Sequence, residues 1–369
     1  MVAELRYELP RNGSTLNFEV YAGLDDLPEE CTQVFNAAPN FALSIPWFRN
    51  MVVHGSRPTA KPYFGVLSDG ASILGVIPLQ HTDGNGFSSL TNCYTCIYHP
   101  LIGSGVAAKE TAYLLGQGLG RLCVGQPLSW MECLPAEWPA LNAFSAGLCA
   151  SSLAVRRFDF FGNWYEPVAH RSWDDYLASR PGKLREVLRR RRRDVARRGT
   201  ISCEIIERGD RLARGKEAYE AVYSRSWKEP EPFPRFNNGL MSEAARLGIL
   251  RLGICWREDK PIAVQLWIVD KGTATVMKLA HDEAEASLSP GTLLTAAIIE
   301  RLMKQEELTE IDFGRGDDPY KQLWTGYRRQ RIGLLIANPR RLSSWRTLAR
   351  HDVGRAVRWL HQRLDVTTG

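Results

Sequence analysis

The segment from His281 to Tyr327 concentrates residues that can bind an anion and transfer protons. Within it, Pro290 and Gly291 open a predicted helix that runs to about residue 304. The first backbone amides of a helix have no partner inside the helix and carry partial positive charge, so they favour phosphate groups. We therefore expect a phosphate-bearing ligand at the start of this helix, although an ordinary Pro-initiated helix would have the same sequence.

A glycine-rich loop follows the next predicted strand, which covers residues 309–313. Loops at strand ends commonly hold catalytic and binding groups. The charged and phenolic side chains of this loop are Arg315, Asp317, Tyr320 and Lys321. A simpler interpretation remains open, in which Asp317 only caps the helix that starts near Pro319 and Tyr320 packs in the core.

The standard catalytic and metal-binding motifs are absent from the sequence. It has no HExxH zinc motif, no Walker A loop and no GxSxG nucleophile elbow. Cys93 and Cys96 form a lone CxxC near His99, and no second pair supplies a fourth ligand. We therefore expect no bound metal. The DFG triplet at 312–314 matches protein kinases by chance, because no catalytic loop accompanies it.

The composition is that of a globular protein with more than one domain. The chain has 369 residues, of which 44% are hydrophobic and 24% charged, and this length suits two domains. Residues 1–10 lack the apolar core of a secretory leader, and no apolar run is long enough to cross a bilayer. The sequence therefore predicts a cytoplasmic protein.

Two halves of the chain show a similar order of strands and helices. Strands are predicted at 63–67, 72–79 and 87–90 in the first half, and at 250–256, 262–269 and 273–279 in the second. Flanking helices are predicted at 111–124, 139–150, 212–227, 238–247 and 291–304. Each half is thus a meander flanked by helices, which indicates two related α/β domains with a junction near 150–160.

Arginines cluster in two further segments. A predicted helix at 183–198 contains five consecutive arginines and ends at Gly199, a suitable C-cap. The tail beyond Pro339 is also basic and predicts an amphipathic helix at 343–364. Such clusters attract anions. The tail either packs on the protein or makes peripheral contact with an anionic membrane surface.

Three separated segments agree in order and spacing with one known family. They are Lys183 to Arg190 with its terminal Gly199, Ser289 to Leu294, and Ile311 to Lys321. Together they resemble the CelD-type (BioF-like) acetyltransferase-like domain of the GNAT superfamily, which is related to Fem-type aminoacyltransferases. The resemblance implies an α/β fold with a mixed, mostly antiparallel sheet and flanking helices, in two tandem GNAT-like domains.

The resemblance also divides the chain and implies a function. Residues 1–151 would form a degenerate GNAT-like domain, 152–340 the catalytic domain, and 341–369 a basic amphipathic helix. The implied reaction is acyl transfer to an amine, from acyl-CoA or, in the Fem branch, from aminoacyl-tRNA. Nucleic acid is expected as a partner only if tRNA carries the donor.

The implied acceptor is a small-molecule, lipid-linked or nucleotide-linked amine, for example an amino sugar of a cell-envelope or exopolysaccharide precursor. A non-catalytic receptor for an anionic nucleotide is a third alternative. Such a receptor would have the same fold and would bind the nucleotide through its arginines.

The resemblance and the chemistry of acyl transfer together assign roles to single residues. Tyr320 is predicted to protonate the leaving thiolate, and Lys321 to neutralise developing charge. Asp317 is the predicted base, with His281 as the reserve. Residues predicted to bind the acyl-CoA donor are Lys278, in a strand whose backbone would hold the carbonyl, and Pro290, Gly291, Thr292, Leu293 and Leu294. Residues predicted to bind the acceptor are Arg185, Arg189, Arg190, Arg315 and Trp227.

Overall fold

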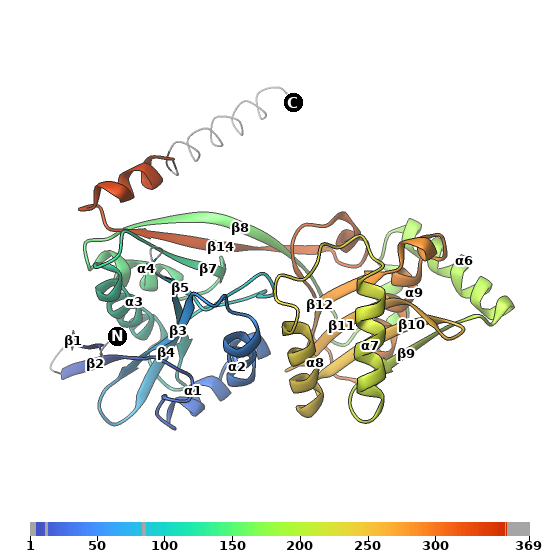
Figure 1. Ribbon diagram of the computed structural model, residues 1–369, viewed down its shortest axis with the longest axis horizontal. Helices are drawn as coiled ribbons and strands as arrows, with labels where there is room; N and C mark the ends of the chain where they lie inside the picture. The colour runs from blue at the N-terminus through green and yellow to red at the C-terminus, as the bar shows by residue number, and fades with distance from the viewer. Residues whose placement is uncertain (1–4, 12–13, 83–85, 351, 353–369) are drawn as a thin grey trace. The chain divides into compact units, whose positions relative to one another are not determined.

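The computed structural model describes residues 5–11, 14–82, 86–350 and 352, and these residues form two compact units (Figure 1). The first unit takes its described residues from 1–52, 56–160 and 330–369, and the second from 53–55 and 161–329. Strands β8 (Ala154–Pro167) and β14 (Tyr327–Ala337) contribute residues to both. The division into 1–151, 152–340 and 341–369 expected from the sequence stays a prediction.

The first unit contains a sheet with the strand order β1-β2-β3-β4-β5-β7-β14-β8, and β6 pairs with β4. Its strands are β1 (Leu5–Arg11), β2 (Ser14–Tyr21), β3 (Ala60–Ser68), β4 (Ile73–Thr82), β5 (Gly86–Ser89), β6 (Leu101–Ile102) and β7 (Leu128–Pro135). Its helices are α1 (Cys31–Asn36), η1 (Phe41–Leu43), α2 (Ile45–His54), α3 (Ala108–Cys123) and α4 (Leu141–Cys149). The pairs β1–β2, β2–β3, β3–β4, β4–β5, β4–β6 and β7–β14 are antiparallel, and β5 pairs with β7 in parallel.

The glycines of α3 serve close packing. A Cβ atom at Gly116 would lie 2.2 Å from the carbonyl oxygen of Phe144 in α4, and one at Gly118 would lie 2.4 Å from the ring of Phe18 in β2. These distances are too short for any side chain. The glycine-rich run therefore allows α3 to lie directly against α4 and the sheet.

The second unit contains a sheet with the order β8-β13-β12-β11-β10-β9. Its further strands are β9 (Ile201–Ile206), β10 (Leu250–Arg257), β11 (Lys260–Asp270), β12 (Thr273–His281) and β13 (Glu310–Arg315). Its helices are α5 (Trp173–Ala178), α6 (Gly182–Arg198), α7 (Arg211–Tyr223), α8 (Phe236–Arg246), η2 (Glu283–Leu288), α9 (Pro290–Gln305) and η3 (Pro319–Leu323). Among the described strands of this unit only β12 and β13 pair in parallel, so the predicted mixed, mostly antiparallel sheet is confirmed.

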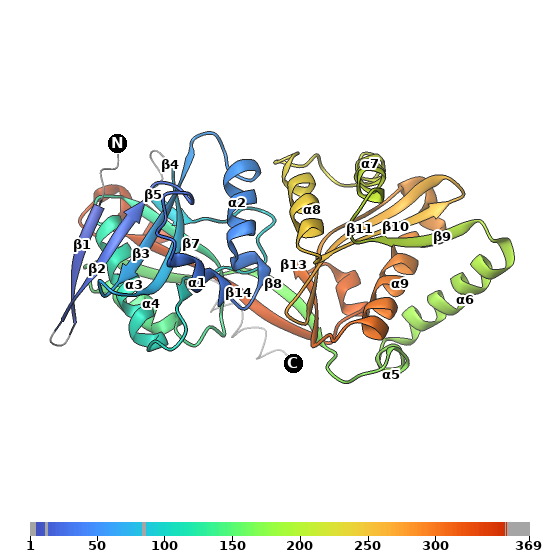
Figure 2. The same cartoon turned by 90° about the horizontal axis from the view of Figure 1, so that it is seen from below.

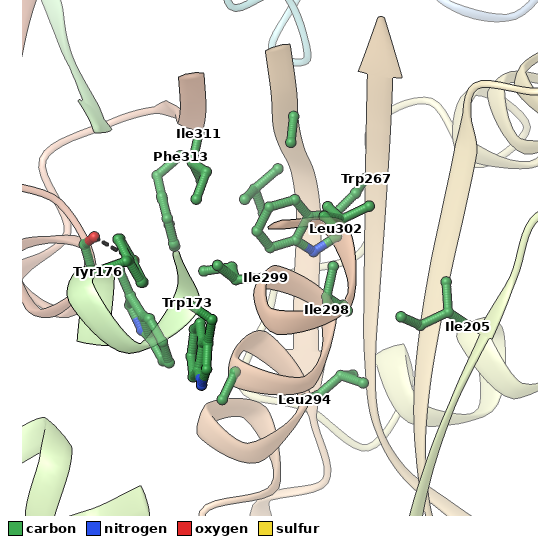
Figure 3. Close-up of a cluster of buried hydrophobic side chains, with 14 of the residues drawn as sticks. Trp173, Tyr176, Ile205, Trp267, Leu294, Ile298, Ile299, Leu302, Ile311 and Phe313 are labelled. Carbon is green, nitrogen blue, oxygen red and sulfur yellow. Dashed lines mark hydrogen bonds between the residues drawn. The ribbon is translucent and has the colours of Figure 1, made fainter. Parts of the chain in front are cut away.

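Helices cover both faces of this second sheet. Figure 2 shows α7 and α8 on one face, and α5 and α9 on the opposite face. Leu294, Ile298 and Leu302 of α9 are buried against Trp267 of β11 and the end of β13 (Figure 3). A Cβ atom at Gly253 of β10 would lie 2.5 Å from Ile298, so this glycine admits the helix to the sheet. The apolar stripe of α9 thereby fixes the position of its N-terminus.

The two basic segments differ in how much the structure describes. Helix α6 ends at Gly199, which has the left-handed conformation (φ 64°) of the predicted C-cap. In the tail, residues 342–350 are helical, and most of the predicted helix at 343–364 lies outside the described residues. No helix in the described part of the chain has the length and hydropathy of a bilayer-spanning segment.

Candidate functional site

A cavity of about 350 Å³ lies in the second unit at the start of α9. Its lining comes from the α7–α8 loop, strands β11 and β12, the η2–α9 junction and η3. Six residues predicted from the sequence meet here: Trp227, His281, Pro290, Gly291, Thr292 and Tyr320. The cavity therefore brings together the helix start and part of the loop that follows β13.

The start of α9 presents backbone amides to this cavity. Ser289 has left-handed backbone angles (φ 54°, ψ 46°), and its carbonyl accepts the first helical hydrogen bond, from Leu293, at 3.1 Å. The amides of Gly291 and Thr292 precede that bond. A Cβ atom at Gly291 would meet only the Nδ1 atom of His281, at 3.8 Å. The geometry thus leaves room for an anionic group beside these amides.

A buried glutamine ties the helix start to the sheet. Gln265 of β11 donates from Nε2 to the carbonyl of Gly291 at 3.0 Å and to Oγ1 of Thr295 at 2.7 Å. Its Oε1 accepts from the indole of Trp267 at 2.9 Å. Sequence analysis missed Gln265 and Thr295, although a single amide in the apolar run 262–269 is a signal that could have found the first.

Strands β12 and β13 separate next to the cavity. They pair only between 273–275 and 310–312, whereas β12 continues to His281. The edge of β12 beyond Thr275 is therefore without a partner from β13 in the described structure. A register shift opposite Leu266 also leaves Met277 as an extra residue in β12. An unpaired strand edge can bind an extended, amide-containing ligand.

His281 lies at the end of β12, beside the helix start. Its ring centroid is 4.5 Å from that of Trp227, which is half exposed. Burial lowers the pKa of His281, while the charges of Glu283 and Asp282 oppose this shift. Asp282 is itself paired with Arg225 at 2.8 Å. The imidazole is therefore held mainly in its neutral form, which can accept a proton.

Tyr320 lines the cavity from η3. Burial raises the pKa of its phenol, and the nearby charge of Asp318 raises it further. Its ring also packs against Phe313, with centroids 6.3 Å apart. The phenol therefore remains protonated at neutral pH and holds the proton that a donor needs, and its raised pKa makes it a weaker acid than a free tyrosine. Its predicted role as the donor to a thiolate stays a prediction.

Lys321 is buried and lies outside the cavity lining. Its ammonium donates to the carbonyls of Arg315, at 2.5 Å, and Gly316, at 3.1 Å, and pairs with Asp318 at 3.2 Å. The side chain is 3% exposed. In this arrangement Lys321 closes the loop after β13, whereas the sequence had predicted direct charge neutralisation.

Asp317 lies outside the cavity lining and accepts hydrogen bonds from two donors. Arg328 pairs with it at 2.7 Å, and the indole of Trp164 donates to it at 2.9 Å. The hydrogen bond from Arg328 lowers the pKa of Asp317 against a smaller opposing effect of burial. A carboxylate with a lowered pKa is a weak base, so this geometry does not favour the predicted role.

A buried polar network fixes the end of β13. Asn163 donates to Asp312 at 2.6 Å and to the carbonyl of Gly314 at 2.9 Å. Asp312 also accepts from the amide of Gly314 and pairs with Arg329, each at 2.6 Å. The DFG triplet therefore has a structural role here, because its aspartate shapes the glycine turn. Sequence analysis did not identify Asn163 or Arg329.

The remaining predicted residues lie outside the cavity lining. Lys278 pairs with Glu231 at 2.9 Å, and Leu293 and Leu294 are buried. The guanidinium of Arg315 lies 4.5 Å from the ring centroid of Phe161. On α6, Arg185, Arg189 and Arg190 are exposed, and Arg189 pairs with Glu186 at 2.7 Å. No cluster of potential metal ligands is found among the described residues.

Comparison with a family model decides the nature of the second unit. Residues 182–322, from the start of α6 to η3, match the acetyltransferase (GNAT) domain. The second unit carries a GNAT domain. The residues that line the cavity lie within the matched segment, except Leu323 and Trp324, which directly follow it. The match supports the predicted class, an N-acyltransferase.

Solved structures show that the fold extends over most of the chain. The chain is similar to FemX, with 9% identity, a TM-score of 0.55, and coverage of 84% of this chain and 96% of that one. It is also similar to a tandem GNAT protein from the clavulanic acid biosynthesis pathway, with 15% identity, a TM-score of 0.51, and coverage of 88% of this chain and 99% of that one. A third similar structure is the C-terminal domain of a putative lysylphosphatidylglycerol synthetase from Agrobacterium fabrum. It has 12% identity and a TM-score of 0.51, and the match covers 82% of this chain and 90% of that one. At these identities the similarity concerns the fold alone. A search of curated proteins finds no significant match.

Proposed function

We propose that the protein is an N-acyltransferase that moves an acyl group, in the simplest case acetyl, from acyl-CoA to a primary amine. The observation that carries this proposal is the position of the cavity, where the open amides of Gly291 and Thr292 meet the unpaired edge of β12. CoA combines phosphates, an extended arm with two amides, and a thioester. Phosphates suit a helix start, and the amides of the arm suit a strand edge.

The proposed reaction is a direct transfer. The neutral amine attacks the thioester carbonyl, whose oxygen gains negative charge and is stabilised by backbone amides near the bulge at Met277. The C–S bond then breaks, and the thiolate takes a proton from Tyr320. The nitrogen loses one proton to the imidazole of His281, and release of this proton to solvent balances the proton that the Tyr320 phenolate regains from solvent. The products are an amide and free CoA, so atoms and charge balance.

Two groups were predicted to remove a proton from the acceptor. His281 suits this role better than Asp317, because it is held neutral in the cavity lining. Asp317 remains paired with Arg328. An amino sugar of an envelope or exopolysaccharide precursor is one acceptor within this proposal.

The test is binding and turnover with acetyl-CoA. Acetyl-CoA should raise the melting temperature of the protein, and release of free CoA should require an added amine. A Thr292→Pro variant removes one of the two amides while keeping a residue tolerated in the first helical turn. It should weaken acetyl-CoA binding. A protein that binds no acyl-CoA of any chain length would contradict the proposal.

A second candidate uses the same fold with aminoacyl-tRNA as the donor. The observation in its favour is helix α6, whose described residues include seven exposed cationic side chains and one exposed acidic side chain. They are Lys183, Arg185, Arg189, Arg190, Arg192, Arg193 and Arg197, with Glu186. RNA bound there would be released steeply by salt. Tight, salt-sensitive binding of aminoacyl-tRNA, without binding of acyl-CoA, would favour this alternative.

The third alternative is a receptor that binds an anionic nucleotide without reaction. It predicts acyl-CoA or nucleotide binding but no release of CoA with any amine. Turnover with one acceptor excludes it.

A further inference from the structure

Lys228, next to Trp227 on the α7–α8 loop, is a partly buried lysine. The described residues offer its ammonium neither a hydrogen-bond acceptor nor an ion-pair partner, and the nearest aromatic contact is the ring of Trp227, whose centroid is 5.4 Å away. A buried ammonium usually gains such a partner, because burial without one is costly. Because Trp227 lines the cavity, this ammonium lies close to its rim.

The surrounding charges increase the demand for an anion. Burial lowers the pKa of Lys228, and the positive charges of Lys278 and Lys321 lower it further. Two carboxylates, of Glu231 and Asp318, act in the opposite direction. Each of these carboxylates already has a lysine of its own.

The pairing of these two carboxylates shows why Lys228 is the unmatched charge. Glu231 pairs with Lys278 at 2.9 Å, and its side chain is 10% exposed. Asp318 pairs with the buried Lys321 at 3.2 Å. Three lysines thus share two carboxylates. A bound anion would balance the cluster and would offset the burial of Lys228.

The position of the cluster indicates which substrate would supply this anion. Leu279 and His281 of β12 line the cavity on the α9 side. Lys278, between Leu279 and the bulge, instead lies 5.9 Å from the ring centroid of Tyr223 in α7, on the opposite face of the sheet. The proposed donor occupies the α9 face. Lys278 and its partner Glu231 therefore extend the charge cluster beyond the donor cavity, where the other substrate, the amine, would approach Lys228.

We infer that Lys228 selects an acceptor that carries an anionic group, a phosphate or a carboxylate, close to its reactive amine. The inference rests on the proposed acyltransferase function. Lys278 and Glu231 hold the loop that presents Lys228, whose ammonium lies over the ring of Trp227. An amine without an anionic group would bind at the same place more weakly.

Three amines of similar size test this inference. Glucosamine has no anionic group, glucosamine 6-phosphate adds a phosphate, and glucosaminate has a carboxylate. Calorimetry with each, in the presence of CoA, gives the ratio of their affinities. The wild-type protein should bind at least one of the two anionic amines about tenfold more tightly than glucosamine, since a charge-assisted contact contributes a factor of this size. The difference in affinity between the two anionic amines shows whether the site prefers a phosphate or a carboxylate.

Three variants make the result specific. Lys228→Met should reduce the ratio to about one, and Lys228→Arg should retain most of the preference. Lys304→Met, which removes an exposed lysine at the end of α9, should leave the ratio unchanged. Melting temperatures of all three variants show whether each is folded.

Two results would overturn the inference. One is a wild-type protein with no preference for either anionic amine. The other is a Lys228→Met variant that keeps the preference, or that loses affinity for acetyl-CoA in place of the acceptor. Binding of acetyl-CoA alone, measured by thermal shift, reports on the proposed donor separately. A protein that does not bind acetyl-CoA is therefore distinguishable from one that binds acetyl-CoA but shows no preference for anionic amines.

Discussion

The ammonium of Lys321 donates a hydrogen bond to the backbone carbonyl of Gly316 at 3.1 Å, across the loop that follows β13. It also donates to the carbonyl of Arg315, so one side chain satisfies two acceptors of a glycine-rich turn. Tyr320, next in the chain, lines the cavity. The lysine thus determines where the phenol lies, and a positioning role explains its burial.

Lys321→Met should destabilise the protein and reduce turnover together. The substitution leaves two partly buried carbonyls without donors and Asp318 without its lysine, which we expect to lower the free energy of unfolding by about 2–4 kcal/mol. Chemical denaturation measures the loss. Lys304→Met, at an exposed site, should cost less than about 0.5 kcal/mol. A fully stable but inactive Lys321→Met variant would instead indicate direct contact with the substrate.

Asp317→Asn and Arg328→Met should have the same, modest effect. The two residues are partly exposed, so their ion pair contributes no more than about 1 kcal/mol. If Asp317 only positions the loop, breaking the pair from either side should lower kcat by less than about tenfold. A general base would give a loss of about 10²- to 10⁴-fold for Asp317→Asn alone. Steady-state kinetics of both variants at saturating acetyl-CoA separate these outcomes.

The strands and helices could be predicted from the sequence more completely than the directions in which the side chains point. The strands predicted at 250–256, 262–269 and 273–279 match β10, β11 and β12, because alternation and turn residues act locally. The predicted junction near 150–160 overlaps β8, a single long strand that contributes residues to both units. Its alternation is weak because few of its residues are buried.

The residues of the candidate site could be predicted only in part, because local sequence patterns do not determine tertiary contacts. Gly291 and Thr292 line the cavity as expected, since a helix start presents its amides wherever the helix packs. The direction of the Lys321 side chain depends on how the loop after β13 folds back, so that the carbonyls of Arg315 and Gly316 face the ammonium. No local sequence pattern encodes this conformation. Gln265 and Asn163 act through partners 30 and 149 residues away in sequence, so only the tertiary structure identifies them.

Gly291→Leu should block donor binding without unfolding the protein. Because a Cβ atom at this position meets only His281, at 3.8 Å, a larger side chain extends into the cavity in place of the ligand. We expect the affinity for acetyl-CoA to fall at least about tenfold, which is about 1.4 kcal/mol. Gly291→Ala is the control. It should change stability by no more than about 1 kcal/mol and should retain most of the binding. Equal binding by both variants would place the donor elsewhere.

His281 should make the protein less stable in mild acid. Burial lowers its pKa in the folded state, whereas the unfolded chain has a value near about 6.5. The unfolded state therefore takes up the proton first as the pH falls. The stability contributed by neutral His281 is complete above about pH 6.5 and is lost as the pH falls through the lower, folded-state pKa.

The comparison of wild type with His281→Gln isolates this effect. Glutamine is uncharged at every pH, so the variant should lose less free energy of unfolding than the wild type between about pH 7.5 and 5.5. His99, whose pKa is also lowered by burial, contributes equally to both proteins and cancels in the difference. Urea denaturation at several pH values measures the two curves. Parallel curves would mean that His281 is protonated equally in the folded and unfolded states, and its proposed role as a neutral proton acceptor would then be lost.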